Sequence, residues 1–132
     1  MIGLLQDIGK IAIDEKILNK PGCLEHEEWS EMKRHPEIGY RILSSSPELH
    51  DYSESIFCHH ERLDGKGYPN GIVENEIPLF SKVLSIADSY DAMTSERTYK
   101  RAMTDTEAAA EFIKHSGTQF DHYLVKIFIT QV

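Results

Sequence analysis

Five histidine and aspartate residues stand in or beside apolar segments of the sequence: Asp7, His35, His59, His60 and Asp88. Burying a carboxylate without a partner is costly or forces it to take up a proton, and a shared cation removes that cost. Imidazole and carboxylate together suit iron, manganese or zinc better than calcium, and an aspartate can bridge two ions. The set therefore predicts a metal site, although any one such residue is more often a helix cap, a surface group or a hydrogen-bonded core group.

The segments that must position these residues have helical spacing and helix boundaries. Residues 27–34 suit a short helix with Trp29 and Met32 facing inward, and Pro36 is well placed to start a second helix that runs to about Leu43. Pro47 and Glu48 open a third helix, which we expect to reach the His59-His60 pair. These helices would carry the histidines toward one another.

The second half of the chain is also predicted to be helical. Pro78 opens a helix in which Val83, Ile86, Tyr90 and Met93 form a buried stripe through roughly residue 94. A Thr104–Glu107 capping box and an apolar run after Asp121 predict two more helices. Strand signals are nearly absent, so the fold class is predicted to be all-α.

Two segments are predicted to be loops. Residues 64–77 combine glycines, Pro69 and an Asn70-Gly71 pair, which favour turns over helix. So long a loop in a small domain indicates a functional surface or a partner contact. Residues 17–24 form the shorter loop.

Composition narrows the class of protein. With 132 residues, 40% of them hydrophobic and 27% charged, the chain suits one globular domain over residues 1–132. It has neither a signal-peptide pattern nor a membrane-length apolar run, so we expect a cytoplasmic location. The net charge of -8 disfavours broad binding to DNA or RNA. An anionic ligand would need local positive charge from a metal or a few placed cations.

Several short motifs, taken in order along the chain, resemble the HD-GYP family of the HD superfamily of metal-dependent phosphohydrolases. Typical members hydrolyse the bacterial second messenger cyclic di-GMP. The resemblance runs from residue 1 to about residue 125. The motifs are Asp7-Ile8-Gly9-Lys10, Arg34-His35-Pro36-Glu37-Ile38-Gly39, His59-His60-Glu61-Arg62, Asp64-Gly65, Gly67-Tyr68-Pro69, the Ala87-Asp88 to Asp91-Ala92 pair, and Arg97 with Lys100.

The resemblance implies a two-metal site within an HD-type helical bundle. Asp7 looks like the aspartate that bridges the metals. His35, His59 and His60 look like the histidines of the second metal, and Asp88 like a ligand of the first.

The resemblance also implies residues that hold the substrate. Lys10 looks like the lysine near the reacting phosphate, and Arg97 and Lys100 look like cations that hold phosphates. Gly67, Tyr68 and Pro69 match the GYP signature, which contacts substrate or a partner domain in the family. Without the resemblance, Arg97 and Lys100 suit an ordinary solvated surface, and Lys10 suits a helix-end cation that faces the helix dipole.

The chain departs from the family pattern at Gln6, which replaces the histidine of the HD pair. An amide oxygen is a weaker ligand than imidazole for these metals, and the upstream helices that supply further ligands in the family have no counterpart before this motif. We therefore expect one firmly bound divalent transition metal, iron or manganese in the first place and zinc or nickel as alternatives. A second ion would be weak or absent.

Two function classes remain open. One is a phosphodiesterase of the cyclic di-GMP type with impaired activity, and the other is a non-catalytic module that binds a nucleotide or a partner such as a GGDEF domain. A metal-free structural bundle is the least favoured reading, because it gives Asp7 and Asp88 no reason to be buried. Without the upstream helices an apolar face would be bare, so we also expect a homo-oligomer.

Overall fold

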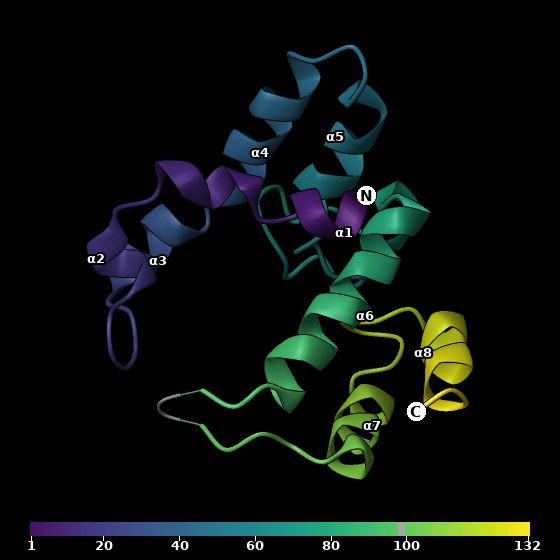
Figure 1. Cartoon of the computed structure of the whole chain (residues 1–132). Helices are drawn as coiled ribbons and strands as arrows, with labels where there is room; N and C mark the ends of the chain where they lie inside the picture. Colours follow the sequence, from purple (N-terminus) through teal and green to yellow (C-terminus); the bar gives the residue numbers. More distant parts are fainter. Residues whose placement is uncertain (98–99) are drawn as a thin grey trace.

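Helices are the regular structure of the described residues, 1–97 and 100–132, in this computed structural model (Figure 1). Only isolated bridges, and no strands, occur in that part of the chain, which confirms the all-α prediction. In chain order the elements are α1 (Ile2–Leu5), the 3-10 helix η1 (Ile8–Ala12), α2 (Glu15–Leu18), α3 (His26–Met32), α4 (His35–Ser44), α5 (His50–Phe57), the 3-10 helix η2 (Glu74–Glu76), α6 (Leu79–Thr94), α7 (Asp105–Lys114) and α8 (His122–Ile129).

The first half of the chain is built around the α4–α5 hairpin, with η1 packed against α4 (Figure 1). Pro36 lies in the first turn of α4, as predicted, and Leu43 and Ile56 are fully buried between the helices. Gly9 of η1 lies so close to α4 that a Cβ atom there would come within 1.8 Å of the His35 carbonyl oxygen. This close approach places the segment that follows α1 directly beside the start of α4.

The second half packs on the long helix α6, which runs diagonally through Figure 1. Its core consists of Ile86, Phe112, Phe120 and Val125, flanked by partly buried apolar side chains from α6 and α8. The predicted capping box is present at the start of α7, and the Asp121 side chain caps α8. A separate apolar core therefore holds α6, α7 and α8 together.

Three details differ from the sequence predictions. Helix α5 ends at Phe57, so His59 and His60 lie in the turn beyond it; the His59 ring bonds the Ile56 carbonyl, which competes with continuation of the helix. Trp29 is 43% exposed, since it packs against Tyr68 and not into the core. Val83 is 45% exposed, because nothing in the described residues covers that side of α6.

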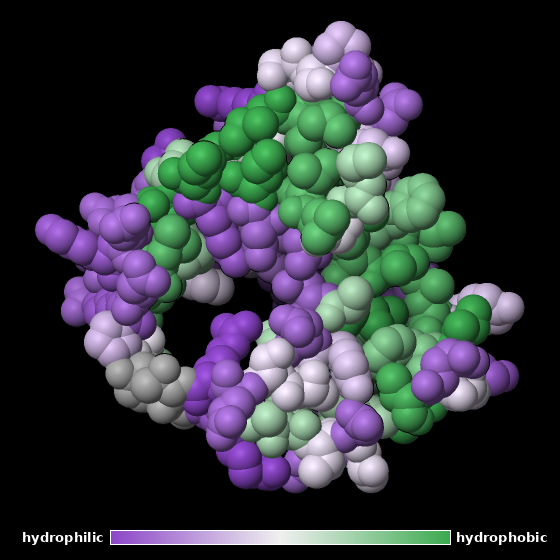
Figure 2. All heavy atoms as spheres, in the orientation of Figure 1, coloured by the Kyte–Doolittle hydropathy of each residue, from purple (hydrophilic) through white to green (hydrophobic). Residues whose placement is uncertain are grey.

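Apolar side chains gather on one outer face of the molecule. Figure 2 shows apolar atoms from α1 along the upper part of α6 to α8. Exposed apolar residues of these helices include Leu4 of α1, which is 90% exposed, and Phe80 of α6. A groove of about 290 Å³ between α6 and α8 lies in this face and is lined by Val83, Ile127 and other apolar residues. We call this surface the apolar face. No helix among the described residues is both long enough and apolar enough to cross a bilayer.

Candidate metal centre

Four predicted ligands converge at one point: Asp7, His35, His59 and His60. They come from the turn after α1, the first residue of α4 and the turn after α5. One ligand atom from each lies within 4.8 Å of the other three. Two ligand atoms that each lie about 2.1 Å from one ion can be at most about 4.2 Å apart. The four residues, which we call the His/Asp cluster, thus need little movement to bind an ion.

Backbone carbonyls orient two of the imidazoles. His35 Nδ1 lies 2.7 Å from the Met32 carbonyl oxygen, and His59 Nδ1 lies 2.5 Å from that of Ile56. Because a carbonyl only accepts, both Nδ1 atoms carry the proton, and the lone pair of each ring lies on Nε2. The Nε2 atom of His59 is buried and has no hydrogen-bond partner among the described residues. A buried Nε2 lone pair without a partner, in a set of imidazole and carboxylate ligands, fits a transition-metal ion.

Burial keeps all three imidazoles neutral at pH 7. Desolvation is the main cause that lowers the pKa of His35 to about 4 and that of His60 to about 2, and it lowers the pKa of His59 as well. Neighbouring imidazoles lower the pKa values of His35 and His60 further. Neutral imidazole is the form that binds a metal. The site is therefore in its ligating protonation state over the whole physiological range.

Asp7 faces both a histidine and a lysine. Its Oδ1 atom is 3.5 Å from His35 Nε2, and its Oδ2 atom is 2.9 Å from Lys10 Nζ. Lys10 comes from η1, only three residues further along the chain, and is partly exposed. The ammonium group thus lies at the edge of the His/Asp cluster, where it can contact an anion bound there.

Asp88 of α6 lies next to the cluster but is not one of its four converging ligands. Gln6 Nε2 donates a hydrogen bond to Asp88 Oδ1 over 3.2 Å. Burial, followed by the charge of Asp7, raises the pKa of Asp88. The residue that replaces the family histidine therefore binds the predicted first-metal carboxylate through an amide donor.

Tyr68 of the GYP motif covers one side of the cluster. Its ring stacks on that of His60, with centroids 4.8 Å apart and planes 23° apart, and its N–H donates to the His60 carbonyl oxygen. Gly67 makes this possible, because a Cβ atom there would come within 2.5 Å of the His60 carbonyl oxygen and the Arg62 nitrogen. Pro69 follows Tyr68 in the loop. The predicted loop of residues 64–77 thus reaches the site through Tyr68, although part of it forms η2.

A hollow of about 290 Å³ opens beside the cluster, and His60, Tyr68 and Asp88 line it. Arg97 and Lys100 do not: they line a separate hollow together with residues 18–22. The backbones of Arg97 and Lys100 bond each other by N–H to carbonyl hydrogen bonds in both directions. The structure therefore brings Asp7, Lys10, His35, His59, His60, Asp88 and Tyr68 to one region, and places the two phosphate-binding candidates elsewhere.

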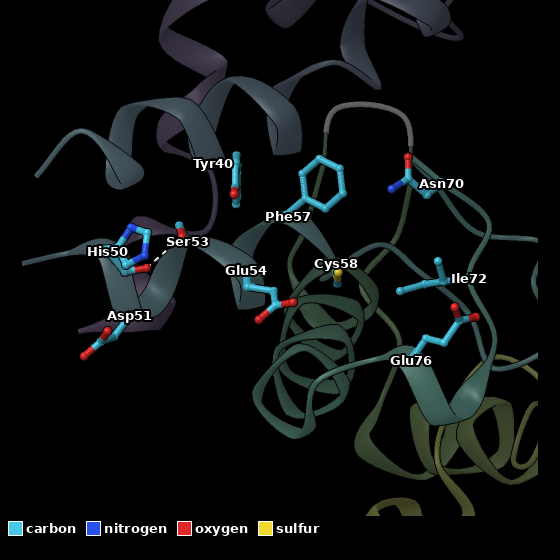
Figure 3. Close-up of a pocket in the computed structure, with 10 residues that line it drawn as sticks. All are labelled: Tyr40, His50, Asp51, Ser53, Glu54, Phe57, Cys58, Asn70, Ile72 and Glu76. Atoms are coloured by element: carbon cyan, nitrogen blue, oxygen red, sulfur yellow. Dashed lines mark hydrogen bonds between the residues drawn. The ribbon is translucent and has the colours of Figure 1, made fainter.

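A larger hollow of about 940 Å³ lies between α4, α5 and the residue 64–77 loop (Figure 3). The paired rings of Tyr40 and Phe57 line it, together with the carboxylates of Asp51, Glu54 and Glu76. No member of the His/Asp cluster reaches it. The three carboxylates would repel an anionic substrate, so the size of this hollow does not make it the candidate active site.

Glu61 is a structural residue of the site whose role was not predicted from the sequence. It is 3% exposed, and its carboxylate accepts hydrogen bonds from the backbone N–H groups of Asn70, Gly71 and Ile72. The signal in the sequence was an acidic residue between the histidine pair and a glycine-rich loop. Glu61 thereby connects the loop of residues 64–77, which we call the GYP loop, to the turn that holds His59 and His60.

Known proteins of one family resemble this chain over most of its length. A family model described as HD domain matches residues 1–124. A cyclic di-GMP phosphodiesterase of Thermotoga maritima is 46% identical over 127 residues, which cover 95% of this chain and 34% of the relative. The cyclic di-GMP phosphodiesterase response regulator RpfG of Xanthomonas campestris is 44% identical over 123 residues, covering 92% of this chain and 32% of the relative.

Two further matches come from Vibrio cholerae. A 3'3'-cGAMP-specific phosphodiesterase 2 is 38% identical over 127 residues, covering 95% of this chain and 24% of the relative. The crystal structure of a cyclic GMP-AMP specific phosphodiesterase, V-cGAP3, superposes with a TM-score of 0.68 at 20% identity, over 97% of this chain and 36% of that chain. This last likeness shows the fold. The chain spans about a third or less of the length of these relatives.

Proposed function

The chain belongs to the HD-domain family, and from that premise we propose that it is a metal-dependent phosphohydrolase domain, of the HD-GYP type, that acts on a cyclic dinucleotide such as cyclic di-GMP. The observation that supports the proposal best is the convergence of Asp7, His35, His59 and His60. Relatives named as cyclic di-GMP and 3'3'-cGAMP phosphodiesterases support the substrate class. We also propose that residues 1–132 form one domain, and that this domain lies in the cytoplasm.

The proposed chemistry is hydrolysis of a phosphodiester. Bound divalent ions supply a water acidic enough to lose its proton near neutral pH, and positive charge for the phosphate oxygens. Asp7, His35, His59 and His60 would hold the firmly bound ion, and the carbonyls of Met32 and Ile56 would fix the rings of His35 and His59. Lys10 would contact the reacting phosphate from the edge of the cluster. Tyr68 would shield His60 from bulk water.

We propose that one ion binds firmly and that it is iron or manganese, with zinc or nickel as alternatives. Three imidazoles and one carboxylate match the preference of these metals. A second ion next to Asp88 would have to compete with the Gln6 amide, which already bonds that carboxylate. Arg97 and Lys100 would hold substrate phosphates only if the substrate reached from the cluster to the hollow that they line.

The hydrogen bond from Gln6 to Asp88 favours a second candidate function. With the first-metal position weakened, the domain would bind a cyclic dinucleotide, or a partner such as a GGDEF domain, without efficient hydrolysis. Removing a metal ligand usually costs orders of magnitude in rate. The two candidates share the metal site and the ligand class, and they differ in turnover.

The test is metal quantification paired with a cyclic di-GMP hydrolysis assay on the purified chain. We expect about one transition-metal ion per chain after reconstitution with iron or manganese. His35→Gln should remove that ion, whereas His50→Gln, which changes an exposed histidine of α5, should keep it.

The outcomes separate the candidates. Product formation that depends on the added metal supports the phosphodiesterase. Nucleotide binding in calorimetry with no turnover supports the non-catalytic module. Failure of the reconstituted wild-type chain to retain any metal, or equal metal content in the two histidine variants, contradicts the proposed centre.

A further inference from the structure

The hollow beside the metal centre has an aromatic and cationic wall that the catalytic roles above do not use. Trp29 and Lys33 line this hollow together with His60, Tyr68 and Asp88. Trp29 lies on α3 and Lys33 caps the end of the same helix, one turn later. The capping box of Glu25 and Glu28 secures the start of α3. The wall is therefore attached to a short, ordered helix at the edge of the proposed active site.

A series of ring contacts connects the His/Asp cluster to this wall. Tyr68 stacks on His60 on one side, and the Trp29 ring meets Tyr68 edge-on, with centroids 6.2 Å apart. Lys33 Nζ lies 5.5 Å from the centre of the Trp29 ring and 5.4 Å from that of Tyr68. Tyr68 thus contacts both a proposed metal ligand, His60, and the Trp29–Lys33 pair.

Lys33 is available to bind an anion. Arg62, another cation of this hollow, is engaged by Asp64 and by Gln119. Lys33 has no carboxylate within 4.0 Å among the residues that the structure describes. The chain has a net charge of -8, and the Lys33 ammonium is held over two aromatic rings without an acidic partner among the described residues. Such a placement favours a role for Lys33 in binding an anion over a role in solubility alone.

We propose that Trp29 and Lys33 form a second subsite, which holds the nucleotide of the substrate that is not being cleaved. The Trp29 ring, 43% exposed, stacks on a purine base, and the Lys33 ammonium binds the second phosphate. The hollow of about 290 Å³ is too small for a whole cyclic dinucleotide but takes one end of it. This inference rests on the proposed function, since it presumes that the other phosphate lies at the His/Asp cluster.

Stacking has a consequence for specificity. Every base presents a ring face, so a stacking platform accepts different bases without reading their edges. Trp29 would therefore accept adenine as well as guanine. A site of this kind would bind cyclic di-GMP and 3'3'-cGAMP with similar affinity.

The sequence contains one tryptophan, so intrinsic tryptophan fluorescence reports on Trp29 alone. The experiment titrates the manganese-loaded 132-residue chain with cyclic di-GMP and follows binding both by calorimetry and by tryptophan emission. We expect a saturable change in emission with the same Kd as the calorimetric signal. Trp29→Leu should raise Kd by roughly five- to fiftyfold, and Lys33→Gln by roughly three- to tenfold.

Conservative and remote variants serve as controls. Trp29→Phe keeps an aromatic ring and should keep Kd within about threefold of the wild type. Lys33→Arg keeps the positive charge and should raise Kd less than Lys33→Gln does. Lys126→Gln removes a charge from an exposed position on α8 and should not change Kd. Metal content must equal that of the wild type in every variant, which separates loss of the subsite from loss of the fold.

Two results would overturn the inference, and they are distinguishable. If calorimetry detects cyclic di-GMP binding while Trp29→Leu and Lys33→Gln leave Kd unchanged, the subsite is wrong and the proposed function stands. If the metal-loaded wild-type chain binds no cyclic dinucleotide, the substrate class fails together with the subsite.

Discussion

At the scale of single residues, buried imidazoles determine the properties of the site. His35 and His59 are 2% and 1% exposed, and both donate from Nδ1 to a backbone carbonyl. Burial disfavours the protonated ring, and the carbonyl bond selects one tautomer. The chain therefore arranges metal-ligand lone pairs before any ion is present, at a cost in stability whenever the solution is acidic.

The metal-free protein should lose stability as the pH falls from about 6.5 to about 4. The folded pKa of His35 is about 4, against 6.5 for an ordinary histidine, so below pH 6.5 the unfolded chain binds a proton that the folded chain does not. His35 alone lowers the free energy of unfolding by at most about 3 kcal/mol across this window. Urea unfolding with EDTA at several pH values measures the slope. His35→Gln should flatten it and His50→Gln should not; equal slopes for wild type and His35→Gln would contradict the prediction.

Gln6 should not be a ligand of the firmly bound ion. Its amide bonds Asp88, not the His/Asp cluster, so Gln6→Ala should leave about one ion per chain, whereas His35→Ala should remove it. Gln6→His places an imidazole beside Asp88 and should move the metal content from about one toward two ions in excess manganese. Elemental analysis after desalting measures both effects. Loss of the ion in Gln6→Ala would show that the amide is itself a ligand.

The sequence identified four candidate ligands that the structure brings together. Asp7, His35, His59 and His60 followed from their apolar surroundings and from the family resemblance, and the structure brings them within ligation reach. The role of Glu61 could not be predicted, because its partners are backbone N–H groups. Almost every residue type has such a group, so the sequence does not show which ones Glu61 will bind. The position of Trp29 depended on the path of the GYP loop, which is set by those same hydrogen bonds.

At the scale of elements, glycines and a buried carboxylate set the distances between the segments that bear the ligands. The helices of the second half were predicted closely, because their caps and apolar spacing are local in sequence. The end of α5 was not, since it depends on a side-chain bond from His59 to the carbonyl of Ile56. Local signals thus predicted the helices, and non-local contacts decided the turns around the site.

Gly9→Ala should disrupt the contact between η1 and α4. The added Cβ atom would lie 1.8 Å from the His35 carbonyl oxygen and 2.7 Å from the Gly39 nitrogen, and backbone atoms cannot yield cheaply. We expect a loss of about 3 kcal/mol or more in stability, together with weaker metal binding because Asp7 moves away. Thermal unfolding and metal content measure the two effects. Gly3→Ala is the matched control, since a Cβ atom there meets nothing within 4 Å; equal behaviour of the two variants would refute the close approach.

Glu61→Gln should loosen the GYP loop. The carboxylate accepts from three N–H groups, whereas an amide offers one acceptor oxygen and turns a second donor toward the loop backbone. We expect a loss of about 2–4 kcal/mol in the free energy of unfolding. Glu54→Gln, at an exposed position of α5, should change it by less than about 0.5 kcal/mol. Denaturant unfolding of both variants provides the comparison, and a neutral Glu61→Gln would show that the loop is held by other contacts.

At the scale of the whole molecule, the apolar face is the feature that the site does not explain (Figure 2). The helices that contribute to it carry exposed apolar residues, among them Leu4 of α1 at 90% and Phe80 of α6 at 63%. Contiguous exposed apolar surface usually belongs to an interface. We propose that at high concentration this face associates with a second copy of the chain.

Light scattering coupled to gel filtration tests this association. The wild-type chain should elute with a mass above that of one chain, and Leu4→Glu should shift it to the monomer because a carboxylate would be buried in the contact. His26→Glu adds the same charge at an exposed site on α3, away from the apolar face, and should leave the mass unchanged. A strictly monomeric wild-type chain at high concentration would contradict the proposal.

The positions of the metal ligands along the chain have a mechanical consequence. All four lie between residues 7 and 60, while the aromatic core of α6, α7 and α8 contains none of them. An ion held there acts as a cross-link that pins α1, α4 and the turn after α5 to one another, and contributes nothing directly to the C-terminal half. Metal supply would therefore act on the rigidity of the first half directly, and on the second half only through contacts between the two, such as the hydrogen bond from Gln6 to Asp88.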